Sequence, residues 1–192
     1  MYWLCRGFGR QTPYEIFSAI TRFVVCRAFG SRPYRSMRLI AYPPHRIDAL
    51  DEVVEALDLV RRTDARLFRR IDENIRQIVL GTSRRPDILG TYWPLNQVCY
   101  LRKLPIFENT HSVAIYSYAA TLVHEATHGI LHKKRIPTTS ANKPRIERIC
   151  YKEETRLMKK LLGHDMKAWK AYLDYLSVLA WKRGRSSEMG RR

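Results

Sequence analysis

The stretch His124-Glu125-Ala126-Thr127-His128 carries two imidazoles and a carboxylate at a spacing that suits metal chemistry. Histidines four residues apart on a helix project from the same face, about one turn apart, so their ring nitrogens can reach one metal ion. Glu125 follows the first histidine directly, and its carboxylate would reach a metal-bound water rather than the metal itself. This H-E-x-x-H pattern predicts a zinc site with Glu125 as a general base.

A third zinc ligand is expected from the helix that follows the motif. That helix is predicted over residues 144–162, with Pro144 in its first turn. Its apolar stripe contains Ile146, Ile149, Cys150, Leu157, Leu161 and Leu162. On a helical wheel, Glu154 lies roughly 35° from the centre of this stripe, Glu147 roughly 55° and Glu153 roughly 65°. A carboxylate in a buried stripe is costly unless it is paired or metal-bound, which favours Glu154 and then Glu147.

The length of the motif helix gives a second test of the third ligand. If that helix runs to about Lys134 and the chain returns antiparallel, a residue near 152 lies opposite Ala126, which favours Glu153 or Glu154. If the helix instead breaks at Gly129, Glu147 is better placed. We therefore expect Glu154 as the ligand, with Glu147 and Glu153 as alternatives. Other residues could ligate the metal or polarise a substrate carbonyl: His132, His111, His164, Tyr116, Tyr118 and Tyr151.

The elements around the motif predict an α+β domain with a small sheet of about three strands. The strands are expected at 75–80, 98–101 and 111–116, with a turn at 90–94. Helices are expected from 47 to about 60 and over 65–72, 118–134, 144–162 and 165–182, and Ser117 is the expected N-cap of the motif helix. Residues 1–45 would form an appended basic helix and linker, residues 46–182 the domain, and residues 183–192 a disordered basic tail.

Residues 111–162 resemble the zincin metallopeptidases of the gluzincin type. The resemblance lies in H-E-A-T-H-G, an apolar strand before it, and a later helix with E-R-I-C-Y-K-E-E-T-R-L-M-K-K-L-L. The segment also resembles the small H-E-x-x-H proteins of the ImmA/IrrE class, in which Glu153 or Glu154 would fall on the third ligand. The resemblance implies a zincin-like fold with the sheet packed on the motif helix, a bound Zn²⁺ and hydrolysis of peptide bonds. The expected substrate is a peptide or protein, held by an edge strand near Ile115.

Two family features are missing from the chain. Lys134 stands where the metzincin motif has a third histidine, and no aspartate follows the candidate glutamates to orient a ligand, as it does in thermolysin-like enzymes. A zincin-fold binding, sensor or toxin-like protein without proteolysis is therefore an alternative.

Composition indicates one globular domain, because the chain has 192 residues and is 45% hydrophobic. No apolar run is long enough to span a membrane and no signal peptide is recognisable, so we expect a cytoplasmic protein. The segment 13–29 is expected to be an amphipathic helix. The four cysteines form no C-x-x-C pair and are expected as free thiols, with Cys150 in the core. They are Cys5, Cys26, Cys99 and Cys150.

The formal net charge of +17 is the second notable feature of the sequence. A positive field of this size attracts polyanions such as nucleic acid or an acidic surface. A basic nucleic-acid-binding protein in which the H-E-x-x-H motif is incidental is therefore a further alternative. No known nucleic-acid-binding motif accompanies the charge.

Overall fold

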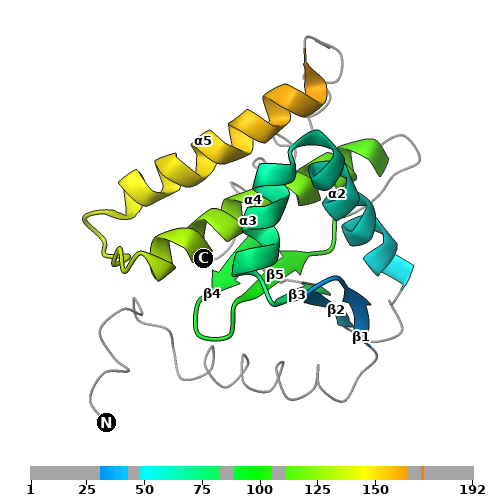
Figure 1. Cartoon of the computed structure of the whole chain (residues 1–192), viewed down its shortest axis with the longest axis horizontal. Helices are drawn as coiled ribbons and strands as arrows, with labels where there is room; N and C mark the ends of the chain where they lie inside the picture. The colour runs from blue at the N-terminus through cyan, green and yellow to red at the C-terminus, as the bar shows by residue number, and fades with distance from the viewer. Residues whose placement is uncertain (1–30, 43–47, 83–88, 105–110, 164–169, 171–192) are drawn as a thin grey trace, which may run out of the picture.

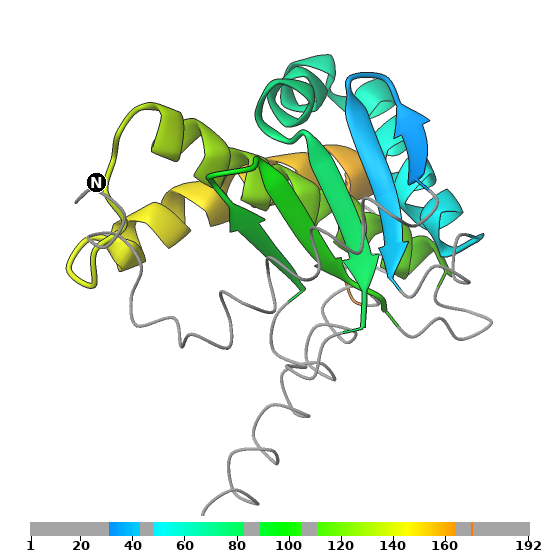
Figure 2. The ribbon, with the colours of Figure 1, turned by 90° about the horizontal axis from the view of Figure 1, so that it is seen from below.

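The computed structural model describes residues 31–42, 48–82, 89–104, 111–163 and 170. These residues form an α+β unit, the class that the sequence predicts, in which one five-stranded sheet is covered by helices on one face (Figure 1, Figure 2). The predicted helix at 13–29 and the basic tail lie outside the described residues. So does the predicted helix at 165–182, except for residue 170.

The sheet has the strand order β1-β2-β3-β5-β4. Its strands are β1 (Ser31–Tyr34), β2 (Met37–Tyr42), β3 (Gln77–Gly81), β4 (Gly90–Trp93) and β5 (Val98–Arg102). The three central strands are parallel, and an antiparallel strand lies at each edge, β1 on β2 and β4 on β5. β4 is therefore the edge strand beyond β5.

Four helices complete the described unit: α2 (Leu50–Thr63), α3 (Ala65–Asn74), α4 (His111–Lys133) and α5 (Lys143–Leu162). The main core lies between the sheet and α2, α3 and α4, where Leu39, Ile78 and Leu101 of the sheet join Val53, Ile71 and Leu122 of the helices. Asp64 caps α3, because its carboxylate accepts the backbone N–H groups of Arg66 and Leu67 at 3.0 and 3.1 Å.

α5 returns antiparallel along α4 and forms the outer helical layer. Its first half packs Ile146 and Cys150 against Leu131, and its last turns pack Met158 and Leu162 against Ala120. Pro144 sits in the first turn, as the sequence predicts. None of the helices in the described ranges has the length and apolar character needed to span a bilayer.

The prediction of a strand over 111–116 is wrong, because these residues form the first turns of α4. Ser117 is not the N-cap either: it lies inside the helix, and its hydroxyl donates to the carbonyl of Val113 at 2.8 Å. α4 is buried around most of its circumference between the sheet and α5, so its apolar residues show no clear helical period. The segment therefore has no local signal that separates a buried helix from a strand. The expected peptide-binding edge at Ile115 does not exist, since Ile115 is buried in α4.

The sheet is larger than the predicted three strands. β1 and β2 occupy residues 31–42, which the sequence assigns to a linker, and β4 occupies the predicted turn at 90–94. β2 pairs in parallel with β3, about forty residues later, with Ile40 opposite Val79. Such pairing leaves no turn signal in the nearby sequence, because the two strands are joined by helices rather than by a hairpin. β4 is only four residues long, too short to show an alternating pattern.

Candidate metal centre

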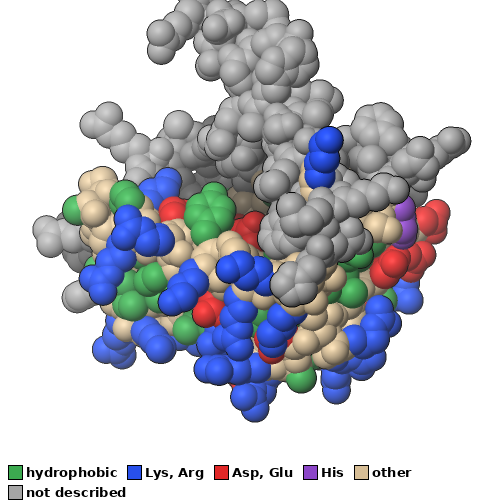
Figure 3. Space-filling view, turned by 90° about the horizontal axis from the view of Figure 1, so that it is seen from above, with side chains coloured by type: hydrophobic (Ala, Val, Ile, Leu, Met, Phe, Trp, Pro, Cys, Tyr) green, Lys and Arg blue, Asp and Glu red, His purple; other side chains and the backbone are tan. Residues whose placement is uncertain are grey.

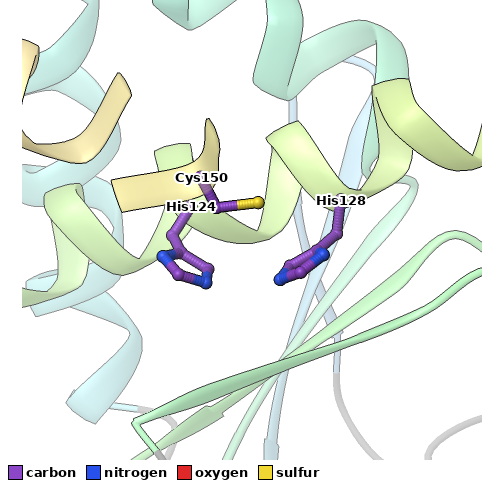
Figure 4. A group of neighbouring side chains, drawn as sticks. All are labelled: His124, His128 and Cys150. Atoms are coloured by element: carbon purple, nitrogen blue, oxygen red, sulfur yellow. The ribbon is translucent and has the colours of Figure 1, made fainter. Parts of the chain in front are cut away.

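The two motif histidines project from the same side of α4, as their spacing requires (Figure 4). The ring centroids of His124 and His128 are 5.0 Å apart. Their side chains are 12% and 21% exposed, so the rings are largely shielded while their site remains open to solvent.

Glu147 of α5 brings one carboxylate oxygen to both rings. Its Oε2 lies 3.3 Å from Nε2 of His124 and 3.8 Å from Nε2 of His128. Ligand atoms about 2.0–2.2 Å from a tetrahedral zinc ion are roughly 3.4 Å from one another. Two imidazoles and one carboxylate are donors that zinc accepts, and the two distances from Glu147 to the rings are close to this ligand-to-ligand spacing.

Glu154, the residue that the wheel argument prefers, contacts the opposite nitrogen of His124. Its Oε2 lies 3.1 Å from Nδ1 of that ring. In metal sites the second nitrogen of a ligating histidine commonly donates to a carboxylate, which fixes the ring orientation. Glu153 is not brought to the histidines: its carboxylate accepts from Arg70 of α3 at 2.8 Å and lies 3.8 Å from Arg156.

Cys150 also reaches the histidine pair, which sequence reasoning missed. Single donor atoms of His124, His128 and Cys150 all lie within 4.8 Å of one another (Figure 4). The thiol is fully buried next to Leu131 and Ile146, which agrees with its expected place in the core. Burial, with a smaller effect of neighbouring carboxylates, raises the pKa of this thiol to about 12. It is therefore a neutral thiol at physiological pH unless a cation stabilises the thiolate.

Glu125 is buried beneath β4. Its residue is 6% exposed, and burial raises the pKa of its carboxyl to about 7, opposed by the nearby His124 ring and assisted by Glu147. The backbone N–H of Tyr92 on β4 donates to this carboxylate. A methyl group on Gly90 would lie 3.1 Å from Oε1 of Glu125 and would collide with the side chain of Thr121. Gly90 therefore allows β4 to approach the general-base candidate closely.

The two histidines differ in their electrostatic surroundings. For His124, burial opposes the charged ring, but the hydrogen bond to Glu154 and the charge of Glu125 outweigh it and raise the pKa. For His128, burial and the proximity of His124 lower the pKa. His128 is thus held as the neutral imidazole that metal ligation requires, whereas His124 carries a proton more readily.

Among the other candidates that the structure describes, Tyr151 lies beside the histidines, with its ring edge-on to His124 at a centroid distance of 4.9 Å. It is 57% exposed. His132 is exposed in the last turn of α4. His111 lies at the start of α4, about 20 Å along the helix from the motif, and pairs with Glu55 at 3.0 Å.

Tyr118 and Tyr116 make packing and hydrogen-bond contacts away from the histidine pair. The hydroxyl of Tyr118 accepts the backbone N–H of Leu104 at 2.9 Å, and Tyr116 packs against the α4–α5 contact. His164 lies outside the described residues.

Comparison with known proteins finds no match for the chain among family models, curated proteins or solved structures.

Proposed function

We propose that this chain is a zinc-dependent metallopeptidase with His124, His128 and Glu147 as the zinc ligands. The observation that carries the proposal is the position of Glu147 Oε2, 3.3 and 3.8 Å from the two Nε2 atoms of the H-E-x-x-H histidines. Glu154 is assigned the orienting role, since it contacts the other nitrogen of His124 at 3.1 Å. This assignment prefers Glu147 over Glu154, the reverse of the order from the helical wheel.

A zinc ion held by these residues would lower the pKa of a coordinated water towards neutrality and polarise the scissile carbonyl. Glu125 would take the proton from the attacking water and pass it to the leaving amine. The Tyr92 N–H and the close packing of Gly90 hold the Glu125 carboxylate in place. A carboxyl with a pKa of about 7 can both accept and return a proton near neutral pH.

The expected substrate is a peptide segment bound in an extended conformation along β4. β4 is the edge strand of the sheet and packs beside α4, close to Glu125. An edge strand offers backbone groups to which an extended peptide can add. In this proposal β4, rather than the predicted strand near Ile115, is the edge that binds the peptide.

A second candidate is a zinc-binding protein without hydrolytic activity, and the position of Cys150 is the observation that favours it. If the thiol joins His124, His128 and Glu147, four protein ligands surround the metal. A closed tetrahedral site of this kind is structural, because no position remains for a water or substrate.

Zinc analysis of matched variants tests the proposal. We expect the purified chain to bind one zinc ion and His128→Ala to lose it. Glu147→Gln should weaken zinc binding more than Glu154→Gln, for which a loss of about 10- to 100-fold is expected. Glu153→Gln is the matched control on the same helix, because its side chain faces Arg70, and it should keep full affinity.

Activity separates the two candidates. Glu125→Gln should keep zinc and lose cleavage of a fluorogenic peptide library, whereas a non-hydrolytic protein would show no cleavage before or after the change. If Glu147→Gln and Glu153→Gln bind zinc equally well, the ligand assignment is wrong.

A further inference from the structure

The outward face of α5 carries five basic residues, which we call the basic stripe. They are Arg145, Arg148, Lys152, Arg156 and Lys159. At 100° per residue they fall within an arc of about 80°, and they extend along about 21 Å of helix. Four of them are exposed, and the Arg156 side chain is 41% exposed. Figure 3 views the molecule from above α5 as drawn in Figure 1, and Lys and Arg side chains are prominent on that face.

No acidic side chain shares the arc of the basic stripe. The other residues within or beside it are Ile149, Thr155 and Lys160. The nearest acidic residues are already engaged: Glu153 accepts from Arg70 at 2.8 Å, and the buried Asp64 accepts from Lys160 at 2.6 Å. Arg156 lies 3.8 Å from Glu153 and 3.9 Å from Asp64, and within the described residues the other four stripe residues have no acidic partner.

Arg145, Arg148 and Lys152 of the basic stripe do not stabilise α5. Like charges three and four residues apart on a helix repel each other and destabilise it. Arg145 also lies in the first turn, where the helix dipole disfavours a cation. Among the stripe residues, the helix dipole favours only Lys159, in the last turn. A polyanionic ligand outside the fold would be attracted by these aligned charges.

The stripe faces away from the candidate metal centre. On the helical wheel, Glu147 and Glu154 lie about 160–180° from Arg145, on the side of α5 that packs on α4. A molecule on the stripe would therefore leave the histidines accessible. An inference about this surface does not depend on the proposed function of the metal centre.

We propose that the basic stripe binds the sugar-phosphate backbone of duplex nucleic acid without reading its base sequence. The stripe is as long as about six base-pair steps of a duplex, measured along the duplex axis. A membrane surface fits less well, because an interfacial helix inserts an apolar face, and the apolar face of α5 is buried against α4. Ile149, 37% exposed, is the large apolar side chain beside this arc.

The test removes four stripe charges at once, in the full-length chain. The stripe variant is Arg145→Gln, Arg148→Gln, Lys152→Gln and Lys159→Gln. Arg156 is kept because it lies 3.8 Å from Glu153 and 3.9 Å from Asp64. The matched control removes the same number of charges from exposed positions elsewhere: Arg38, Arg62, Arg76 and Lys134, each to Gln. Binding of a fluorescent 20-base-pair DNA is measured by anisotropy over a series of salt concentrations.

We expect the stripe variant to bind at least tenfold more weakly at low salt, with the slope of log K against log salt reduced by about 3–4. The control variant should lose less than threefold. Single Arg148→Gln and Lys152→Gln variants should each reduce the slope by about 1, which keeps the test valid if the fourfold variant folds poorly.

Three results would overturn the proposal. Equal losses in the two fourfold variants would mean that total charge, not this surface, attracts DNA. Wild-type affinity in the stripe variant would place binding elsewhere on the chain. Stripe-dependent binding to phosphatidylserine vesicles that exceeds binding to DNA would assign the surface to membranes. Zinc content, measured in parallel, should be the same in all variants, so a failure here is distinct from a failure of the metallopeptidase proposal.

Discussion

The buried carboxyl of Glu125 should make the metal-free protein less stable as pH rises. Its pKa is about 7 in the folded chain and has an ordinary value of 4.5. Below pH 4.5 the carboxyl is protonated in both the folded and the unfolded chain, so no buried charge lowers the free energy of unfolding. Between pH 4.5 and 7 the unfolded chain releases the proton while the folded chain retains it, and the free energy of unfolding falls. Above pH 7 the loss is complete.

The size of this effect follows from the two pKa values, which differ by about 2.5. At about 1.4 kcal/mol per pKa unit, the folded state loses roughly 3 kcal/mol between pH 4.5 and pH 8. Glu125→Gln replaces the carboxyl with a neutral group of the same shape and should not show the loss. The stability of the variant relative to wild type should therefore increase by roughly 3 kcal/mol over this range.

Urea unfolding in the presence of a chelator, repeated from pH 4.5 to 8, measures this difference. The comparison between variant and wild type removes contributions that the two proteins share. Glu73→Gln, at an exposed position of α3, controls for the loss of one negative charge. Curves for Glu125→Gln and wild type that stay parallel across the whole range would refute the claim that burial governs this carboxyl.

Three further predictions concern the site and its supports. Gly90→Ala should lower the free energy of unfolding by about 1–3 kcal/mol in urea titrations, because the added methyl collides with Thr121; unchanged stability would contradict the close packing. Because Cys150 is not a ligand in the proposed site, cobalt-substituted protein should lack a sulfur-to-cobalt charge-transfer band, and Cys150→Ser should keep its zinc affinity. A charge-transfer band that disappears in Cys150→Ser would instead support the closed, non-hydrolytic site. Zinc affinity, measured by competition with a chelator, should fall as pH decreases, because protons compete for His124, whose pKa is raised; a pH-independent affinity would argue against imidazole ligation.

The H-E-x-x-H spacing was sufficient to place His124 and His128 on one side of a helix, because helical geometry is local. The periodicity of residues 144–162 likewise predicted α5, since its apolar stripe is separated from charged residues. The excess of basic residues was also evident from composition. These features depend on neighbours within a few turns, which a sequence displays directly.

Tertiary structure decided the features that depend on distant partners. The parallel strand β2 pairs with β3 far along the chain, and the buried first half of α4 has no polar face to reveal its helical period. The rotation of α5 about its axis determines that Glu147 approaches both Nε2 atoms while Glu154 reaches Nδ1 of His124. A wheel drawn for one helix cannot supply that rotation, because it is fixed by packing against α4 and by the Arg70–Glu153 pair.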